Sequence, residues 1–582
     1  MKQVLSVQDV KKVYRVRKTK GNKQTKLNAL DGISFCLNEG EAFGIIGASG
    51  CGKSTLLRTL MMLMEENCQI DKGAVFFEET DLTKLSEKEL RLLRGKDIVM
   101  IFQNAALSSN PLHKIGHQFY ETITSHSGKM SKKECYAKAE DILKKLKFKE
   151  PKRILNSYPF ELSGGMKQRV AIAIALACNP DLIIADEPTT ALDVTVQRQI
   201  LDLLKKIAEE THTAIVLVSH DLGVIASMCS RVLVMKEGRI VEEGSMEQIF
   251  YEPAHPYTKK LSDMARKLYQ VPEKKKTGEV ILRTQGLGRS FVKNSLFGKS
   301  RSLEAVEPLS FEIHKGETFG LVGESGSGKT TLARMLTGII PPSCGSFSCE
   351  GKIQMIFQEA SASFDPEFSL ERILEEPLVI QKKGSKKERE KRVAEMLGLV
   401  QMEKIDVRKT TAALSGGQRQ RIAVARALLL NPELLICDES FSSQDILTQS
   451  QLLELLEEIQ RKTQLSYLFI SHDLSVVKHI SDEIAVMYLG QIVEKAECKD
   501  LFKYPSHPYT QALLSAVPIP SIDYHVDRIV LEGDVPSPIN PSPGCRFAGR
   551  CRFCKEKCRH ETPELKDIGN GHMVACHFVG EF

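Results

Sequence analysis

An internal repeat constrains the fold of this chain more than any other feature. Four short motifs occur twice, each pair 252 residues apart: LSGGM and LSGGQ (162–166, 414–418), LIIADE and LLICDE (182–187, 434–439), VSHDL and ISHDL (218–222, 470–474), and HPYT (255–258, 507–510). An earlier pair, GASGCGKST and GESGSGKTT, begins at 47 and 323, so the first half has an insertion between Lys53 and Gln103. An ordered series of this kind indicates two homologous units.

The repeat divides the chain into segments. We predict a first unit at 1–262, a charged linker at 263–278, a second unit at 279–530 and a Pro- and Cys-rich extension at 531–582. In each half, short apolar runs such as AFGIIG and TFGLVG alternate with longer helical patterns such as TVQRQILDLLKKIAEE. This alternation predicts an α/β fold with a mostly parallel sheet.

Composition excludes several classes of protein. The 582 residues are 42% hydrophobic and 26% charged, which is typical of globular domains. The net charge of +6 is too small for this length to indicate a nucleic-acid partner, and none is expected. The beginning of the chain lacks the pattern of a secretory signal peptide, and the longest apolar stretch, 170–185, is interrupted by polar residues. We therefore expect a cytoplasmic protein without a membrane span of its own.

Both units carry a phosphate-binding loop. Gly47-x4-Gly52-Lys53-Ser54 and its counterpart at 323–330 each lie between an apolar strand and the start of a helix. Backbone N–H groups of such a loop wrap phosphates, the lysine reaches the β- and γ-oxygens, and the hydroxyl binds Mg²⁺. The loop residues predicted to bind ATP are Gly47, Ser49, Gly50, Gly52, Lys53, Ser54, Thr55, Gly323, Ser325, Gly326, Gly328, Lys329, Thr330 and Thr331.

Two carboxylates end a later strand in each half. Because successive strand residues face opposite ways, they can take separate tasks. We predict that the aspartates hold Mg²⁺ together with the loop hydroxyls, and that the glutamates polarise the attacking water. A histidine closes a further strand in each half, where it can donate to the γ-phosphate. The Mg²⁺ residues are Ser54, Asp186, Thr330 and Asp438, and the catalytic residues are Glu187, Glu439, His220 and His472.

With LSGGM or LSGGQ between the phosphate loop and the acidic strand, each half resembles an ATP-binding cassette of the ABC family. The resemblance implies two tandem cassettes, each with a helical subdomain, and ATP held between the phosphate loop of one cassette and the signature of the other. One site then combines Lys53, Gln103, Glu187 and His220 with Ser415, and the other combines Lys329, Gln358, Glu439 and His472 with Ser163. The signature residues are Ser163, Gly164, Gly165, Ser415, Gly416, Gly417 and Gln418.

The resemblance implies further roles. Tyr14 and Phe291, which precede the phosphate loops, are expected to stack on adenine, and Gln103 and Gln358 to link Mg²⁺ to a transmembrane partner. The two halves differ at Met166, where a glutamine would complete the signature, and in the loop between Glu439 and Asp445. We expect the loop difference to make the two ATP sites unequal.

HPYT, the Pro-rich segment and the spaced tail cysteines resemble the ATP-binding subunits of oligopeptide and dipeptide importers, here with two subunits fused. The resemblance implies an ATPase on the cytoplasmic face of the inner membrane, working with two integral-membrane permeases and, through them, an extracytoplasmic solute-binding protein. Di- or oligopeptides are the leading solutes, with nickel, metal chelates and glutathione as alternatives. A soluble twin-cassette ATPase that acts on ribosomes or DNA is a further alternative, although its longer charged linker and its clusters before the cassettes are not matched.

Five of the fifteen cysteines lie in the last 38 residues, which in a reducing compartment indicates a metal rather than disulfides. In several members of the importer family, four tail cysteines hold an iron–sulfur cluster. The matching positions are Cys545, Cys551, Cys558 and Cys576, and Cys554 is additional. Four thiolates also suit zinc, so a [4Fe–4S] cluster, zinc and unliganded thiols all remain open.

Overall fold

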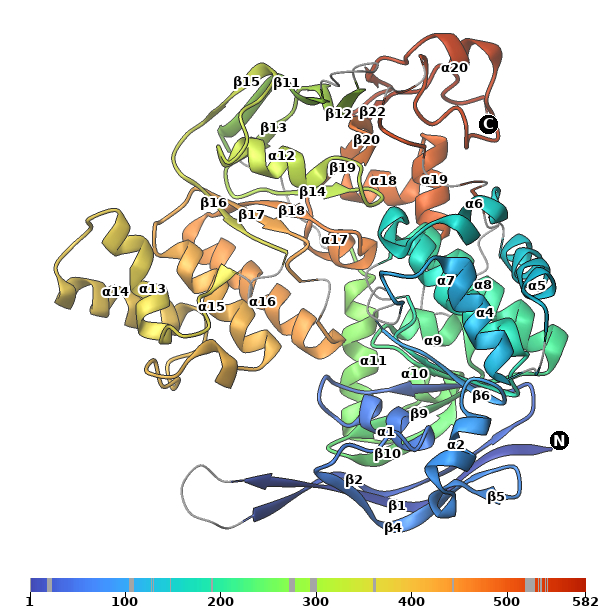
Figure 1. Cartoon of the computed structure of the whole chain (residues 1–582). Helices are drawn as coiled ribbons and strands as arrows, with labels where there is room; N and C mark the ends of the chain where they lie inside the picture. Colours follow the sequence, from blue (N-terminus) through green and yellow to red (C-terminus); the bar gives the residue numbers. More distant parts are fainter. Residues whose placement is uncertain are drawn as a thin grey trace. The chain divides into compact units, whose positions relative to one another are not determined.

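A computed structural model describes residues 2–17, 24–103, 109–126, 128, 130–146, 148–189, 192–271, 278–293, 301–358, 363–441, 444–518, 529–531, 533, 536–539, 541 and 543–581. The chain divides into two compact units, the first made mainly of Met1–Arg266 and the second of Lys267–Val517 and Val526–Phe582 (Figure 1). Among the described residues, no helix is long and apolar enough to cross a lipid bilayer.

The first unit contains two sheets. An antiparallel sheet has the order β2-β1-β4-β5, and a mostly parallel sheet has the order β10-β9-β3-β8-β7-β6. The strands are β1 (Gln3–Arg17), β2 (Gln24–Asn38), β3 (Ala42–Ile46), β4 (Cys68–Phe77), β5 (Thr80–Asp81), β6 (Ile98–Ile101), β7 (Leu182–Asp186), β8 (Ala214–Val218), β9 (Arg231–Lys236) and β10 (Arg239–Ser245). β7 and β8 are apolar and almost wholly buried, as expected for parallel strands covered on both faces.

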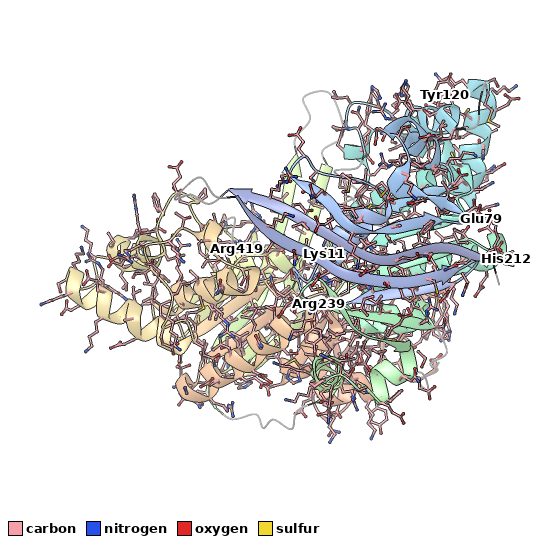
Figure 2. All side chains as sticks on the ribbon, turned by 90° about the horizontal axis from the view of Figure 1, so that it is seen from below. Lys11, Glu79, Tyr120, His212, Arg239 and Arg419 are labelled. Atoms are coloured by element: carbon pink, nitrogen blue, oxygen red, sulfur yellow. The ribbon has the colours of Figure 1, made fainter. Side chains whose placement is uncertain are left out.

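Asp31 in β2 links the antiparallel sheet of the first unit to the mostly parallel sheet through its ion pair with Arg239. Lys11 in β1 and Arg239 in β10 both contact Asp31 in β2, with N···O distances of 3.1 Å and 2.5 Å (Figure 2).

The helices of the unit are α1 (Lys53–Leu60), α2 (Glu87–Leu93), α4 (Ile115–His126), α5 (Lys132–Lys145), α6 (Pro151–Asn156), α7 (Gly164–Ala175), α8 (Val194–Thr211), α9 (Leu222–Met228), α10 (Met246–Tyr251) and α11 (Pro256–Leu268).

Helices α4 to α7 form a helical subdomain with its own apolar core. Phe119, Ile123, Cys135, Ala139 and Leu143 are fully buried there, at the spacing of one helix face. This subdomain and the mostly parallel sheet confirm the fold class expected for the first half.

The second unit repeats this arrangement and extends its parallel sheet. The sheet order is β16-β17-β18-β14-β19-β20-β22-β21, and a smaller antiparallel sheet joins β12, β11, β13 and β15. The strands are β11 (Val280–Lys293), β12 (Arg301–Leu309), β13 (Glu312–His314), β14 (Thr318–Val322), β15 (Cys344–Cys349), β16 (Ile353–Ile356), β17 (Leu434–Asp438), β18 (Ser466–Ile470), β19 (Glu483–Tyr488), β20 (Gln491–Glu497), β21 (Lys566–Asp567) and β22 (Met573–Val574).

The helices of the second unit are α12 (Lys329–Leu336), α13 (Leu370–Ile380), α14 (Lys386–Leu399), α15 (Gly416–Leu428), α16 (Ile446–Thr463), α17 (Leu474–Ile480), α18 (Cys498–Lys503), α19 (Pro508–Ser515) and α20 (Glu556–His560). Helices α12 to α19 correspond in order to α1, α4, α5 and α7 to α11 of the first unit, and α20 lies in the tail. In Figure 1, α13 and α14 lie beyond α15 and α16, away from the sheet.

The structure adds detail to two predicted segments, the linker at 263–278 and the extension at 531–582. Helix α11 continues to Leu268, six residues into the predicted linker, because Leu261, Ala265 and Leu268 form a buried stripe; linker residues 272–277 lie outside the described parts. The tail packs onto the second unit, where Val574 pairs with Glu494 and extends the sheet. The domain boundaries given above remain predictions.

Candidate functional site

The first phosphate loop connects β3 to α1. Gly47 has φ +155°, and a Cβ placed there would lie 2.4 Å from the Met235 carbonyl oxygen, so only glycine fits. Gly52, with φ +108°, precedes the first turn of α1. The buried Lys53 ammonium donates hydrogen bonds to the carbonyl oxygens of Gly47 (2.6 Å) and Ala48 (3.0 Å). The loop is therefore closed around its own lysine.

The end of β7 brings the expected acidic residues to this loop. The Ser54 hydroxyl donates to Asp186 Oδ1 at 3.4 Å, which places the two predicted Mg²⁺ ligands together. Glu187 accepts a hydrogen bond from Gln103 Nε2 at 2.7 Å and lies 3.1 Å from His220 Nδ1. The structure thus gathers the predicted residues of the first unit at the carboxyl ends of adjacent strands.

The second unit reproduces this geometry. Lys329 donates to the carbonyl oxygens of Gly323 (2.7 Å) and Glu324 (2.9 Å), and Thr330 Oγ1 donates to Asp438 Oδ1 at 3.2 Å. Glu439 accepts from Gln358 Nε2 at 2.9 Å and lies 3.4 Å from His472 Nδ1. The same cluster of residues therefore occurs in both units, each time assembled from segments far apart in the sequence, which is not expected by chance.

Burial and neighbouring charges set the protonation of these groups. Burial raises the pKa of Asp186 and of Asp438 above the ordinary aspartate value, and the adjacent glutamates add to the rise. Burial lowers the pKa of His220 and His472, but the glutamate beside each histidine outweighs it, so both pKa values are raised. A cation placed between each aspartate and its hydroxyl partner would favour the ionised carboxylate.

Both signature serines begin a helix. Ser163 accepts a hydrogen bond from Met166 N at 3.3 Å at the start of α7, and Ser415 accepts one from Gln418 N at 3.3 Å at the start of α15. A methyl group on Gly164 would meet nothing within 4 Å. Packing inside the first unit therefore does not require a glycine there.

The second glycines of the two signatures sit against a neighbouring helix. A Cβ on Gly165 would lie 2.9 Å from Val196, and one on Gly417 would lie 2.5 Å from Thr448. The Met166 difference leaves the serine cap intact, because the cap uses a backbone N–H. The loops that differ between the halves include 190–191 and 442–443, which lie outside the described residues.

The two predicted adenine contacts have different surroundings. The Tyr14 side chain lies beside Thr55 at the start of α1, and the Lys12 ammonium is 5.6 Å from the centre of its ring. Phe291 lies in β11 with 37% of its surface exposed, and the Arg289 guanidinium is 4.7 Å from its ring. Tyr14 is therefore adjacent to a phosphate loop, and the exposed Phe291 ring is available for stacking.

The structure gathers the tail cysteines. The thiols of Cys545, Cys551, Cys558 and Cys576 are within electrostatic range of one another, and the Cys545 N–H donates to the Cys558 carbonyl at 2.8 Å. Burial raises the pKa of Cys545 to about 12 and that of Cys551 to about 11. Cys554 lies beside Cys551 and Cys558.

Backbone amides point at three of these thiols. Cys545, Cys551 and Cys576 each accept a hydrogen bond from the N–H two residues later, donated by Phe547, Phe553 and Phe578. Four neighbouring thiols, three of which accept amide hydrogen bonds, fit an iron–sulfur cluster or a zinc ion, both of which thiolates ligate.

Both HPYT motifs contact the phosphate loops, a role that was not predicted from the sequence. The tyrosine of each HPYT motif accepts a hydrogen bond from the second residue of a loop: Tyr257 from Ala48 N (2.9 Å) and Tyr509 from Glu324 N (3.0 Å). The repetition of HPYT was the signal that could have revealed this role. The Glu324 carboxylate also forms a buried ion pair with Arg550 in the tail.

Comparisons with known proteins agree with this geometry. The ABC transporter family matches residues 30–190 and 306–442, and the oligopeptide/dipeptide transporter C-terminal region matches 241–291 and 493–558. The glutathione import ATP-binding protein GsiA of Salmonella typhi is 39% identical over 94% of this chain and 94% of its own length. The GsiA proteins of Pectobacterium atrosepticum (39%, covering 95% and 94%) and Escherichia coli O157:H7 (40%, covering 89% and 91%) are similar.

Two solved structures share the twin-cassette fold. An archaeal ribosome recycling factor, solved in complex with a ribosomal stalk protein, is 23% identical with a TM-score of 0.54, over 81% of this chain and 86% of its own. The RNase-L inhibitor is 22% identical, also with a TM-score of 0.54, over 82% and 87%. These two support the fold alone.

The duplicated phosphate loops, acidic strands and signatures define a twin-cassette ATPase. The chain belongs to the ABC transporter family, and within it to the group that carries the oligopeptide/dipeptide transporter C-terminal region.

Proposed function

We propose that this chain is the energy-coupling subunit of an importer for small peptides, with glutathione, itself a tripeptide, as the first solute to test. The proposal is supported by two matching clusters of the residues predicted to bind and hydrolyse ATP, in a chain similar over nearly its whole length to glutathione import ATP-binding proteins. Peptides in general follow from the C-terminal region that it shares with oligopeptide and dipeptide transporters.

Each site has groups for every requirement of ATP hydrolysis. Lys53 and Lys329 exchange their loop carbonyl partners for phosphate oxygens, and the loop N–H groups hold the remaining charge. Ser54 with Asp186, and Thr330 with Asp438, would hold Mg²⁺, which neutralises charge that develops on the phosphates.

Glu187 and Glu439 orient and polarise the attacking water. Their hydrogen bonds to Gln103 and Gln358 and their proximity to the histidines fix their direction. The raised pKa of His472 favours the protonated ring, which can donate to the γ-phosphate. Tyr14 and Phe291 stack on adenine in this proposal.

ATP binding joins the cassettes head to tail. Ser163, Gly164 and Gly165 complete the site of Lys329, and Ser415, Gly416, Gly417 and Gln418 complete the site of Lys53. The open space around Gly164 supports this arrangement. Packing within the unit gives no reason for a glycine there, whereas the close approach of a nucleotide bound to the other cassette would give one. Closure by two MgATP and reopening on hydrolysis shift the conformations that the membrane partner experiences.

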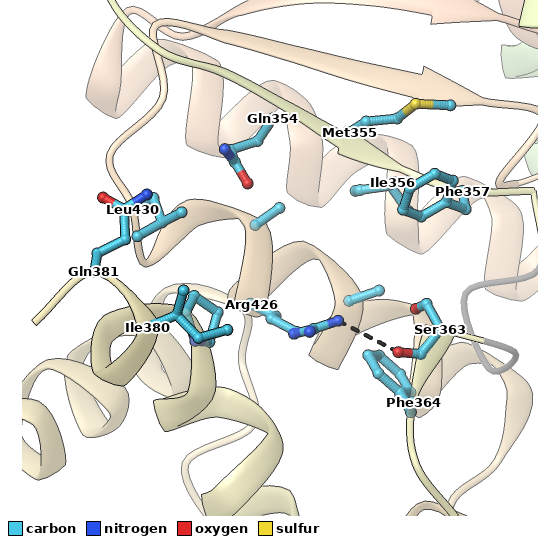
Figure 3. Close-up of a pocket in the computed structure, with 13 residues that line it drawn as sticks. Gln354, Met355, Ile356, Phe357, Ser363, Phe364, Ile380, Gln381, Arg426 and Leu430 are labelled. Atoms are coloured by element: carbon cyan, nitrogen blue, oxygen red, sulfur yellow. Dashed lines mark hydrogen bonds between the residues drawn. The ribbon is translucent and has the colours of Figure 1, made fainter. Parts of the chain in front are cut away.

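A groove beside Gln358 supports a permease contact. A cavity of about 290 Å³ lies between the sheet and the helical subdomain of the second unit, lined by Met355, Phe357, Phe364, Ile380 and Arg426 (Figure 3). Phe357 and Ile380 are 40% and 72% exposed, which leaves apolar surface available to a partner. We propose that a cytoplasmic segment of an integral-membrane permease docks there, with an extracytoplasmic solute-binding protein acting through the permease pair.

Transport assays test the solute. Cells that lack this chain should lose uptake of labelled glutathione or of a labelled dipeptide, and the intact chain should restore it. The double variant Glu187→Gln/Glu439→Gln is the matched control, because it preserves both site shapes and removes both carboxylates. Restored nickel uptake without peptide uptake would contradict the proposal.

Purification with associated proteins separates the importer from soluble twin-cassette ATPases. In mild detergent the chain should copurify with two polytopic membrane proteins and sediment with the inner membrane, on its cytoplasmic face. Copurification with ribosomal or DNA-repair proteins and no permease would assign it to the other class.

The tail cysteines form a metal site in this proposal, with a [4Fe–4S] cluster favoured over zinc. Cys545, Cys551, Cys558 and Cys576 are the ligands, and the three amide-to-thiol hydrogen bonds favour the thiolate form, against the burial that raises the pKa of these thiols. Anaerobic purification followed by iron, sulfide and zinc analysis distinguishes the two. A stoichiometric amount of neither metal would contradict the site.

A further inference from the structure

The second phosphate loop carries a charge that the first one lacks. Glu324 follows Gly323, whereas Ala48 occupies the equivalent position after Gly47. Glu324 is 2% exposed, and its backbone participates in the loop: its N–H donates to Tyr509 and its carbonyl oxygen accepts from Lys329. A buried carboxylate beside a triphosphate site is unfavourable for nucleotide unless a cation neutralises it.

The tail supplies that cation. Arg550 Nη1 donates to Glu324 Oε2 at 2.6 Å and Nη2 donates to Oε1 at 3.1 Å, a two-pronged pair in which the Arg550 side chain is 4% exposed. Arg550 also lies 3.4 Å from the Tyr488 hydroxyl. These contacts direct the Arg550 guanidinium towards the phosphate loop and restrict its side chain to few conformations.

The segment that carries Arg550 lies between two of the tail thiols. Cys545 and Cys551 flank it, and backbone hydrogen bonds from Ala548 to Cys545 and from Arg550 to Phe547 fold it into a tight turn. Phe547 is 2% exposed and packs on Tyr509, with ring centroids 5.4 Å apart. One short segment therefore reaches both the carboxylate and the tyrosine that contact the second phosphate loop.

We infer that Arg550 is a positioning residue for the second phosphate loop, through which the tail thiols control nucleotide binding at that loop and not at the first. When the thiols are held together, both ends of the Cys545–Cys551 segment are fixed and Arg550 neutralises Glu324. When they are released, the segment gains freedom, the pair weakens and the carboxylate opposes the phosphates. This inference rests on the proposed roles of the loop and of the tail thiols, but not on the identity of the solute.

Nucleotide binding to the full chain tests the link. Titration of a fluorescent ATP analogue with Mg²⁺ is done in a Lys53→Ala background, where binding reports the second loop, and in a Lys329→Ala background, where it reports the first. We expect Arg550→Gln to weaken binding at the second loop by roughly tenfold or more and to leave the first within about twofold, because only one loop loses its counter-charge. Cys551→Ser should act in the same direction and at the same loop.

Two further variants act as controls. Arg552→Gln removes an exposed positive charge on the other side of Cys551 and should change neither loop. Glu324→Ala copies the first loop, so Glu324→Ala/Arg550→Gln should recover most of the lost affinity and should no longer respond to Cys551→Ser. Thermal unfolding of each variant establishes that it is folded.

The outcomes are distinct. A folded Arg550→Gln chain with unchanged affinity at the second loop would overturn the inference, as would equal weakening at both loops or a failure of Glu324→Ala to restore binding. If Arg550→Gln does not fold, the double variant decides, because a continued response to Cys551→Ser there would also overturn it. Failure of the proposed function is separable: absent peptide uptake leaves this link intact, whereas a wild-type chain that binds no nucleotide refutes the ATP sites themselves.

Discussion

The first glycine of each signature offers a test in which stability and activity move in opposite directions. Gly164 and Gly416 are the first residues of α7 and α15, and neither has a positive φ. A methyl group on Gly164 meets nothing within 4 Å, and one on Gly416 meets only the end of the Gln444 side chain at 3.2 Å. Alanine therefore fits both positions within each unit.

Gly164→Ala and Gly416→Ala should stabilise the chain slightly. Replacing glycine at a compatible position gains about 0.4–1 kcal/mol, chiefly by restricting the unfolded chain. For a unit of this size, the unfolding temperature should rise by roughly 1–4 °C. Lys386→Ala is the matched control, because Lys386 is also the first residue of a serine-capped helix, α14, and is exposed.

Because each glycine serves one of the two sites, the double variant Gly164→Ala/Gly416→Ala should lower ATP hydrolysis by about tenfold or more, which is about 1.4 kcal/mol in activation free energy. The reason is that the added methyl group occupies the surface where the γ-phosphate of the opposite cassette must approach. Differential scanning calorimetry and phosphate release measure the two effects on the same samples. A stabilised variant with unchanged ATPase rate would refute the role of these glycines.

The backgrounds described above identify which site each signature serves. With Lys53→Ala, hydrolysis depends on the second phosphate loop, so Gly164→Ala should abolish the remaining rate and Gly416→Ala should leave it nearly unchanged. With Lys329→Ala the pattern should reverse. The opposite pattern would refute head-to-tail pairing while leaving the two ATPase sites in place.

Three further predictions concern the second unit. Burial lowers the pKa of His507 to about 4, so below its ordinary pKa the unfolded chain takes up a proton that the folded chain does not. The free energy of unfolding should therefore fall on acidification from pH 7 towards 4, by up to about 3 kcal/mol, and less so in His507→Asn, as thermal melts across this pH range would show. Gly323→Ala should prevent folding or nucleotide binding, since its Cβ would lie 2.1 Å from a carbonyl oxygen, whereas Gly326→Ala, with open space and φ +77°, should cost only about 1 kcal/mol in a thermal melt. Arg550→Met should destabilise the unit by about 3–5 kcal/mol in calorimetry because the buried Glu324 carboxylate loses its arginine counter-charge, and removing both charges should recover most of that loss.

The sequence predicted the parts of each site that have short, local signatures. The phosphate loops, acidic strand ends and signature serines could be recognised because each requires particular residue types at fixed spacing, and their repetition fixed their correspondence. The structure brings Gln103, Glu187 and His220 together because parallel strands deliver their carboxyl ends to one edge of a sheet. Their chemical roles remain predictions until hydrolysis is measured.

The contacts between the tail and the second unit could not be predicted in the same way. Arg550 and Glu324 are 226 positions apart, and neither residue alone has a pattern that indicates its partner. The strands β21 and β22 are two residues each, too short for a detectable alternation. Their positions depend on tertiary packing, such as the pairing of Ala575 with Val493.

The difference between the loops gives a final prediction from the first unit. Ala48 lies where Glu324 lies in the second loop, and its N–H likewise donates to the tyrosine of an HPYT motif. The first half of the sequence has no copy of the tail that carries Arg550, so Ala48→Glu would introduce a carboxylate without that counter-charge. In a Lys329→Ala background, this substitution should weaken the fluorescent ATP analogue by about tenfold, because charge repulsion is strong in a partly desolvated site. Ala48→Gln, similar in size and uncharged, should weaken it much less. Equal losses for the two variants would mean that side-chain size rather than charge matters at this position, and the need for Arg550 opposite Glu324 would then lie in folding rather than in nucleotide binding.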